Sequence, residues 1–217
     1  MSDVVDAAAG RARRPRGSLS AEQIVAGARE LIEKNGLDGL SMPALGRYLD
    51  AGVTSIYWYF RSKDDLVRTV VDEVADEVAA GLPAFGAADW DAALLDFFAA
   101  LHRVLLDNAV AREVFVAHAS ALFAHPAIRQ RFGQGVDLLM RTGLSEDDAV
   151  CGMRVCSNYT GGFVLIERSR RGADRNEFES GLRVLVNGLR HPMPDASATA
   201  GDDTAAQGTD SFWDEWT

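Results

Sequence analysis

The sequence predicts an all-α protein in which a small N-terminal three-helix unit precedes a larger helical bundle. Apolar residues recur at intervals of three and four along most of the chain, as they do on the buried face of an amphipathic helix. Helix-capping serines and stop glycines divide the chain into segments of helical length. No alternating apolar–polar pattern of convincing strand length occurs. The 217 residues are 47% hydrophobic and 25% charged, which is the composition of a globular protein with a sizeable core.

Four helices are predicted in the first 80 residues. The first covers residues 20–35, begins at a serine that is a favourable N-cap and stops at a glycine. A second, short helix over 41–49 also begins at a serine N-cap. The tight connection at 50–52 leads into a third helix over 53–59. A longer amphipathic helix over 63–80 follows.

Two glycines and Pro83 interrupt the pattern between residues 81 and 88, so the domain junction is expected there. Helical periodicity then resumes in five segments, over residues 90–108, 112–123, 126–142, 145–171 and 174–190. The expected organisation is a flexible basic arm over 1–17, a helix-turn-helix domain over 18–66, a larger helical domain over 67–190 and a disordered acidic tail over 191–217.

Charge is distributed unevenly along a chain whose net charge is −10. Residues 1–70 hold ten Lys and Arg against nine Asp and Glu, whereas residues 71–217 hold twelve against twenty-three. Attraction to nucleic acid depends on the local patch, so this division permits a DNA-binding first domain. No apolar run is long enough to predict a membrane span. Cys151 and Cys156 suit neither a disulfide framework nor a zinc site, and a reduced, cytoplasmic thiol pair is expected.

The order of short helices in residues 20–66 is that of a helix-turn-helix, whose second helix lies in the DNA major groove. At the helix predicted over 53–59, Ile56 and Phe60 are four residues apart and form an apolar seam for packing. Hydroxyl-bearing side chains lie elsewhere on it, and Lys63 follows at the start of the next helix. The hydroxyls belong to Thr54, Ser55, Tyr57 and Tyr59.

Residues 19–67 resemble the DNA-binding domain of the TetR family. The shared features are the GLDGLS step at 36–41 and the SIYWYFRSKDDL run at 55–66. The resemblance implies that Ser41, Tyr57 and Lys63 contact phosphates, while Thr54, Ser55 and Tyr59 face the bases. Two positions depart from the family pattern. Asp50 replaces the usual turn glycine, which is tolerable because Asp adopts the left-handed conformation more readily than most residues. Pro43 replaces a basic residue that often reads bases.

Each aromatic or basic group also has a purely structural interpretation. Large rings tend to be buried, so Trp58 and Phe60 are expected in the core. Tyr57 and Tyr59 are expected outside, because two adjacent tyrosines cannot both bury their hydroxyls cheaply. The arginines of the arm, Arg14 and Arg16 with Arg11 and Arg13, are either solvated or inserted in the minor groove.

The second half of the chain resembles, more weakly, the C-terminal domain of the tetracycline-repressor branch. The resemblance implies a ligand-binding bundle whose helices 145–171 and 174–190 pair with those of a second copy. The adjacent Gly161 and Gly162 suit either that close approach or an ordinary packing site within the chain. The histidine that ligates the drug-bound magnesium corresponds to Phe115, so neither a metal site nor a cofactor is expected.

An apolar pocket for an apolar or amphipathic small-molecule effector is expected in its place. Its candidate lining residues, each of which could equally be core, are Trp90, Phe97, Leu101, Phe115, His118, Met140, Met153 and Asn158. His118 is the candidate polar anchor or, alternatively, a structural histidine. The expected function is that of a cytoplasmic, homodimeric, ligand-released repressor bound to a palindromic operator, although activation stays open. No catalytic motif in the sequence indicates an enzyme. The alternative function is that of a helical scaffold or adaptor without operator binding.

Overall fold

The computed structural model describes residues 19–86, 89–169 and 175–190, and they contain helices but no strand. The expected arm over 1–17 and tail over 191–217 lie outside them. The helices are α1 (Ala21–Asn35), the 3-10 helix η1 (Leu37–Gly39), α2 (Met42–Tyr48), α3 (Val53–Tyr57), α4 (Lys63–Gly81), α5 (Trp90–Asp107), α6 (Ala109–Ala117), α7 (Ala119–Ala124), α8 (Pro126–Met140), α9 (Glu146–Ser169) and α10 (Arg175–Gly188). Within these ranges, no helix combines the length and apolar character needed to cross a bilayer.

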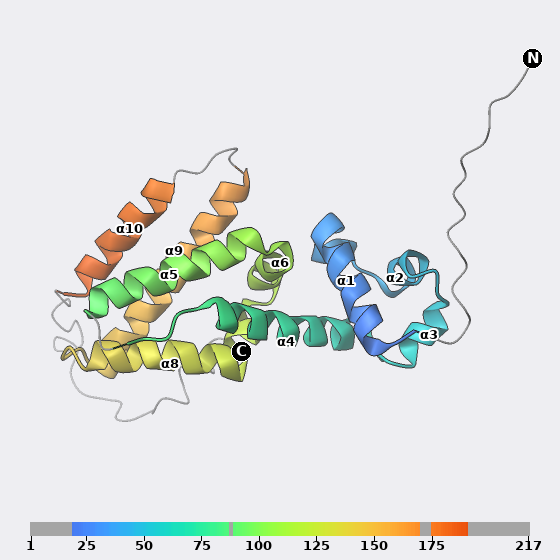
Figure 1. Cartoon of the computed structure of the whole chain (residues 1–217), viewed down its shortest axis with the longest axis horizontal. Helices are drawn as coiled ribbons and strands as arrows, with labels where there is room; N and C mark the ends of the chain where they lie inside the picture. Colours follow the sequence, from blue (N-terminus) through green and yellow to red (C-terminus); the bar gives the residue numbers. More distant parts are fainter. Residues whose placement is uncertain (1–18, 87–88, 170–174, 191–217) are drawn as a thin grey trace, which may run out of the picture.

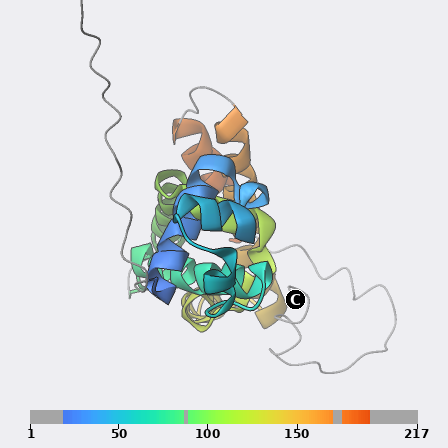
Figure 2. The same cartoon turned by 90° about the vertical axis from the view of Figure 1, so that its right-hand side faces the viewer.

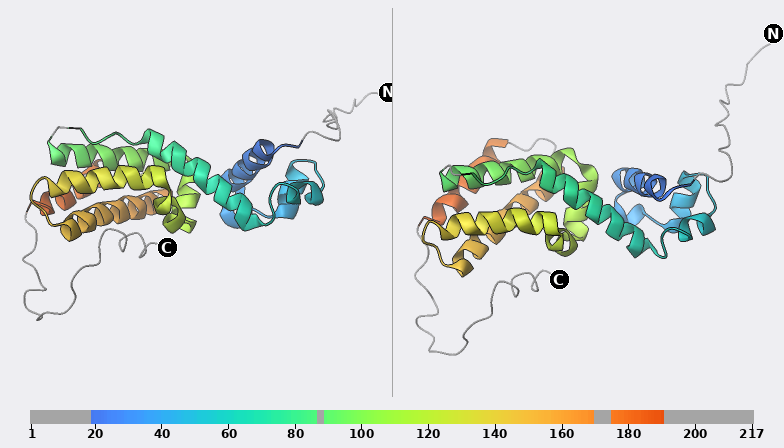
Figure 3. Two further views of the ribbon diagram at one scale, coloured as in Figure 1. Left: turned by 90° about the horizontal axis from the view of Figure 1, so that it is seen from below. Right: turned by 60° about the horizontal axis from the view of Figure 1, so that its bottom comes forward.

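Helices α1, α2 and α3 gather at one end of an elongated molecule, and α5 to α10 form a bundle at the other (Figure 1). The first group is called the head below. Helix α4 leads out of the head and into the bundle, as both views in Figure 3 show. It therefore belongs to both parts.

The predicted helix starts in the head are confirmed by their capping hydrogen bonds. Ser20 and Gln23 form a reciprocal capping box at the start of α1. The Oγ atom of Ser41 accepts a hydrogen bond from the backbone N–H of Ala44 at 3.2 Å. Gly36 ends α1 with a φ of 70°, a conformation that glycine adopts without the steric cost of a Cβ.

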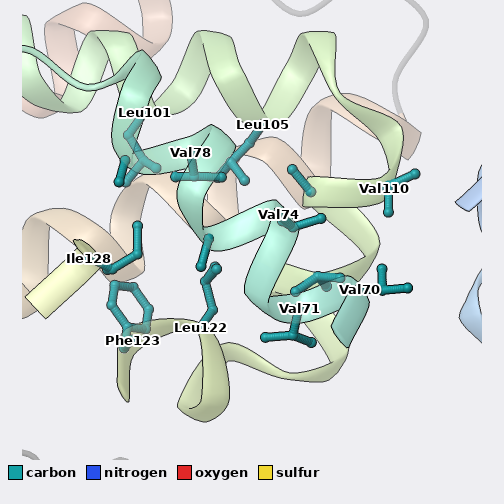
Figure 4. Packing of buried hydrophobic residues seen from close by; sticks show 14 of the residues in the cluster. Val70, Val71, Val74, Val78, Leu101, Leu105, Val110, Leu122, Phe123 and Ile128 are labelled. Atoms are coloured by element: carbon teal, nitrogen blue, oxygen red, sulfur yellow. The ribbon is translucent and has the colours of Figure 1, made fainter. Parts of the chain in front are cut away.

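Buried valines of α4 form the centre of the bundle's core (Figure 4). Val74 and Val78 on α4 are fully buried, as are Leu101 and Leu105 on α5, and all four lie in one hydrophobic cluster. Leu122 of α7 belongs to the same cluster. Since apolar burial contributes about 25 cal/mol per Å² removed from water, this packing holds α4 firmly to the bundle.

One predicted helix, over residues 112–123, is divided in the structure. Helix α6 ends at Ala117 and α7 begins at Ala119. His118 between them has φ −136° and ψ 38°, outside the helical region. The helical periodicity of the sequence continues across this break, so the periodicity alone did not reveal it.

The two adjacent glycines of α9 have different surroundings. A Cβ on Gly161 would lie 2.2 Å from a ring atom of Phe115, so this glycine lets α6 pack closely on α9 within the chain. A Cβ on Gly162 would meet nothing within 4 Å. Of the two interpretations, intrachain packing therefore holds for Gly161, while Gly162 faces outward.

Candidate nucleic-acid interface

The turn between α2 and α3 fixes the orientation of α3 relative to α2. Asp50 has a φ of 51°, the left-handed conformation expected where the family usually has glycine. The Ala51 N–H donates to the Gly46 carbonyl at 2.9 Å. A Cβ on Gly46 would lie 3.0 Å from a methyl of Val53, so the start of α3 packs directly on α2.

A polar contact on the head holds α2 against α1. The Tyr48 hydroxyl donates to the Glu30 carboxylate and accepts a hydrogen bond from the Lys34 ammonium at 3.0 Å. The bond from Tyr48 lowers the pKa of Glu30, and the same hydroxyl raises the pKa of Lys34. Both groups therefore stay charged at neutral pH.

One side of α3 packs against the rest of the head, and the other side is exposed. Ile56 is fully buried and Phe60 is 6% exposed, so the predicted apolar seam is confirmed. Thr54 and Ser55 are exposed, and Tyr57 and Tyr59 are each 48% exposed. Figure 2 turns this end of the molecule toward the viewer.

Trp58 does not lie in the core, so that expectation was wrong. Its side chain is 85% exposed, at the residue directly after α3. At 100° per residue, position 58 lies about 200° from Ile56 and so faces away from the seam. The expectation rested on the size of the ring, whereas the helical periodicity already placed it outside. Trp58 therefore adds a large apolar group to the exposed face of the head.

Two of the residues expected at phosphates, Ser41 and Lys63, lie on the helices before and after α3. Ser41 is exposed at the start of α2. The Lys63 ammonium donates to the Leu37 carbonyl at 3.2 Å. Arg47, which sequence reasoning missed, is exposed on α2 and lines a surface hollow together with Pro43 and Val53. Arg14 and Arg16 lie outside the described residues.

The candidate pocket residues of the bundle separate into three environments. Phe97, Leu101 and Met153 are buried, and the Phe97 ring stacks on Phe85 at 4.7 Å between centroids. Another group, half-buried, consists of Trp90, Phe115 and His118. The remaining two, which are exposed, are Met140 and Asn158.

Polar atoms inside the bundle were not anticipated from the sequence. The Ser157 Oγ, Gln134 Oε1 and His125 Nδ1 atoms are buried without a hydrogen-bond partner among the described residues. Buried polar groups in proteins are usually hydrogen-bonded, so these atoms are exceptions to the rule. The sequence offered no signal for them, because burial of a single polar residue on a mixed helix face depends on its neighbours.

A buried histidine–carboxylate pair was also missed. His102 Nε2 of α5 lies 2.7 Å from the Glu167 carboxylate of α9, and both side chains are less than 10% exposed. The His102 ring stacks on Phe178 of α10 at 3.9 Å between centroids. The pair joins α5 to α9, and the ring stack adds α10. In the described ranges, no group of three or more His, Cys, Asp or Glu side chains is arranged to hold a metal ion.

A helix-turn-helix with an outward-facing second helix, joined by α4 to a helical bundle, is the architecture of a DNA-binding regulator. The model of the tetR family of bacterial regulatory proteins matches residues 24–70. An HTH-type transcriptional regulator of Saccharopolyspora erythraea is 32% identical over 190 residues, which cover 87% of this chain and 77% of that protein. The chain belongs to the TetR family.

Two further relatives agree with this membership. An HTH-type transcriptional repressor of Mycobacterium tuberculosis is 35% identical over 162 residues, or 74% of this chain. The match spans 62% of the length of that repressor. The crystal structure of BioQ with its double-stranded DNA operator is 27% identical, with a TM-score of 0.63 over 79% of this chain and 98% of BioQ. The family consists of regulatory proteins, which supports the expectation that the chain is not an enzyme.

Proposed function

We propose that this protein is a cytoplasmic, homodimeric transcriptional repressor that binds a palindromic operator and is released by a small-molecule effector. The observation that carries the proposal is the exposed face of α3, which presents hydroxyls and aromatic rings while Ile56 anchors the helix. A helix presented in this way fits the major groove, where side chains reach base edges. The operator-bound structure of BioQ, a neighbour of this fold, supports the assignment.

The proposed contacts separate into positioning and reading groups. Ser41, Tyr57 and Lys63 bind phosphates, which position the head without reading sequence. Thr54 and Ser55 contact base edges from the exposed side of α3. The Lys63 ammonium retains donor hydrogens beyond its bond to Leu37, because an ammonium carries three.

Dimerisation is assigned to α9 and α10. Val155 and Leu165 on α9 and Val184 on α10 are exposed apolar side chains, and Val184 is 71% exposed. Gly162 leaves open space on α9 into which a partner helix fits. Two copies related by a two-fold axis would place two α3 helices on successive half-sites of a palindrome.

The effector is proposed to bind within the bundle, beside the unpartnered polar atoms of Ser157 and Gln134. An apolar or amphipathic molecule suits the largely apolar interior of the bundle, and the buried oxygens supply polar anchors. The valines of α4 pack on α5 and α7, so a shift of the bundle tilts α4. The head is attached to the N-terminal end of α4 and moves with it. Such coupling is typically worth about 1–3 kcal/mol, or about 5- to 150-fold in operator affinity.

The effector site is tested with Phe115→Arg, which places a charge against Gly161 on α9. We expect the variant to bind operator but to lose its response to any molecule that releases the unmodified protein from DNA. A full response of Phe115→Arg to that molecule would place the pocket elsewhere. His118→Ala serves as a milder companion variant, because His118 lies between α6 and α7.

DNA binding itself is tested by selecting duplexes from a random pool with the full chain. We expect a two-fold symmetric consensus. Lys63→Ala should weaken binding to the selected duplex and to random DNA by similar factors and reduce the dependence of affinity on salt. Arg141→Ala, which removes an exposed cation at the end of α8, is the charge-matched control. Failure to select any duplex would count against the repressor function.

A further inference from the structure

One hydrogen bond joins the end of α3 to the root of the basic N-terminal segment. The Tyr59 hydroxyl donates to the backbone carbonyl of Leu19 at 2.6 Å. Leu19 is the first described residue after the segment that contains Arg14 and Arg16, and it packs, half-buried, against the hydrophobic core. The bond connects residues 40 positions apart in the chain.

Resting on the DNA-binding function proposed above, we infer that Tyr59 is a positioning residue that fixes, beside α3, the point from which the basic segment 1–17 leaves the head. A phenol carries a single hydrogen, and here that hydrogen is given to Leu19. Toward DNA the Tyr59 hydroxyl can therefore only accept. Phosphate oxygens also only accept, so Tyr59 does not bind phosphate in this arrangement, and we assign it the positioning role in place of the base contact that the family resemblance implies.

Tyr57 provides the contrast. Its side chain has the same 48% exposure as Tyr59. Within the described part of the chain, the Tyr57 hydroxyl forms no hydrogen bond, so its proton is available to a phosphate. The two neighbouring tyrosines thus have different duties, although their residue type and exposure are the same.

The position of Leu19 matters because the arginines are close to it in the chain. Arg16 is three residues before Leu19 and Arg14 is five. At about 3.5 Å per residue, their backbones reach at most roughly 10 and 17 Å from Leu19. This is enough to cross one sugar–phosphate backbone from the major groove into the adjoining minor groove, where arginine is favoured. A fixed root raises the effective concentration of these arginines at that groove.

The test combines Tyr59→Phe with removal of residues 2–17. Four proteins are compared by fluorescence anisotropy on the duplex that the full chain selects, over a range of salt concentrations. In the full chain we expect Tyr59→Phe to weaken binding by about two- to tenfold, the effect of one ordinary hydrogen bond, and to reduce the salt dependence. In the chain that lacks 2–17, the same substitution should change affinity by less than about 1.5-fold, because additivity fails between coupled groups.

Tyr57→Phe is the matched control, since it removes the same atom from the neighbouring ring. We expect its loss of affinity to be equal with and without residues 2–17, as befits a direct phosphate contact. If Tyr59→Phe also loses the same factor in both backgrounds, Tyr59 contacts DNA itself and the positioning role is wrong.

A second measurement needs no DNA and so separates this inference from the repressor function. A nitroxide is attached at Ser18→Cys in a chain that also carries Cys151→Ser, which removes the exposed thiol. We expect the spectrum of the label to show faster motion when Tyr59→Phe is added. Unchanged motion would overturn the anchoring role, whatever the protein does on DNA.

Discussion

At the residue scale, single side chains in the head hold backbone conformations on which the presentation of α3 depends. Asp50 adopts a φ of 51° in the turn between α2 and α3. This conformation places Cβ close to the following carbonyl oxygen, which costs an L-residue other than glycine roughly 1–2 kcal/mol. The turn is nevertheless maintained, because α3 is anchored on the other side by the buried Ile56. Part of the stability of the head is therefore spent on this turn.

Replacing Asp50 changes that cost in a predictable direction. We expect Asp50→Gly to raise the free energy of unfolding by up to about 1 kcal/mol, because glycine adopts a positive φ without strain. Asp50→Val should lower it by about 1–2 kcal/mol, since a β-branched residue tolerates this conformation worst. Urea denaturation followed by circular dichroism measures both changes. Equal stability of the two variants would show that the turn relaxes to another conformation.

The two cysteines of α9 differ in reactivity although they are five residues apart. Cys151 is exposed, whereas burial of Cys156 raises its pKa to about 12. The thiolate is the reactive form, so Cys156 is inert at neutral pH. We expect Ellman's reagent at pH 8 to modify one thiol per chain in the folded protein and two in denaturant. Rapid modification of Cys151→Ser in the folded state would contradict this burial.

At the element scale, α6 contacts the head directly as well as through α4. The Glu113 carboxylate of α6 accepts a hydrogen bond from the Leu37 N–H of η1 at 3.3 Å. At the start of α6, the Asn108 amide donates to Glu77 of α4, and Glu77 pairs with Arg29 of α1 at 2.7 Å. The carbonyl of Leu37 in turn accepts from Lys63, the proposed phosphate contact. A movement of α6 would therefore change contacts at η1 and at Arg29 of α1.

Removal of the Glu113 carboxylate should loosen this connection. We expect Glu113→Ala to lower the free energy of unfolding by about 1–3 kcal/mol, because the half-buried Leu37 N–H loses a charged acceptor. Amide exchange at Leu37 should accelerate by more than tenfold, and by a larger factor than exchange within α5. Hydrogen exchange resolved by residue measures both. Glu33→Ala, which removes an exposed carboxylate of α1, is the control and should leave the Leu37 amide as it was.

At the scale of the whole molecule, the two parts of the chain differ in charge balance, with a net charge of +1 over residues 1–70 and −11 over residues 71–217. The balanced charge of residues 1–70 lets the head approach DNA, and the acidic remainder keeps the bundle away from it. One short helix buries little surface on DNA, so useful affinity needs two heads acting together. The dimer proposed through α9 and α10 supplies the second head.

The dimer contact is tested by Val184→Asp. Val184 is 71% exposed, so the substitution costs the single chain little. In a two-fold interface each substitution is met twice, and we expect the dimer dissociation constant to rise by at least about a hundredfold. Light scattering at micromolar concentration should report a monomer, with operator binding lost in parallel. Val116→Asp, at an exposed valine of α6, should remain dimeric. A dimeric Val184→Asp would move the interface to another face.

Local patterns of the sequence were sufficient for the helical class, for the starts of α1, α2 and α4, and for the family. Caps such as Ser20 and Ser41 act within four residues, and the seam of Ile56 and Phe60 follows from the period of one helix. Interactions between residues so close in the sequence do not depend on the tertiary structure. The DNA contacts of Ser55, Tyr57 and Lys63 are predictions that follow from the motif at 55–66.

Only the tertiary structure decided features that depend on what lies opposite a residue. Trp58 is outside the core because none of the helices that the structure describes covers the outer face of α3, and size alone cannot reveal that. The pairing of His102 with Glu167 joins positions 65 residues apart. Tyr57, the last residue of α3, and Tyr59, just beyond it, also differ only through what lies opposite them. Residue type and exposure make Tyr57 and Tyr59 equivalent, and only the carbonyl of Leu19, brought beside Tyr59 by the packing of α1, distinguishes them.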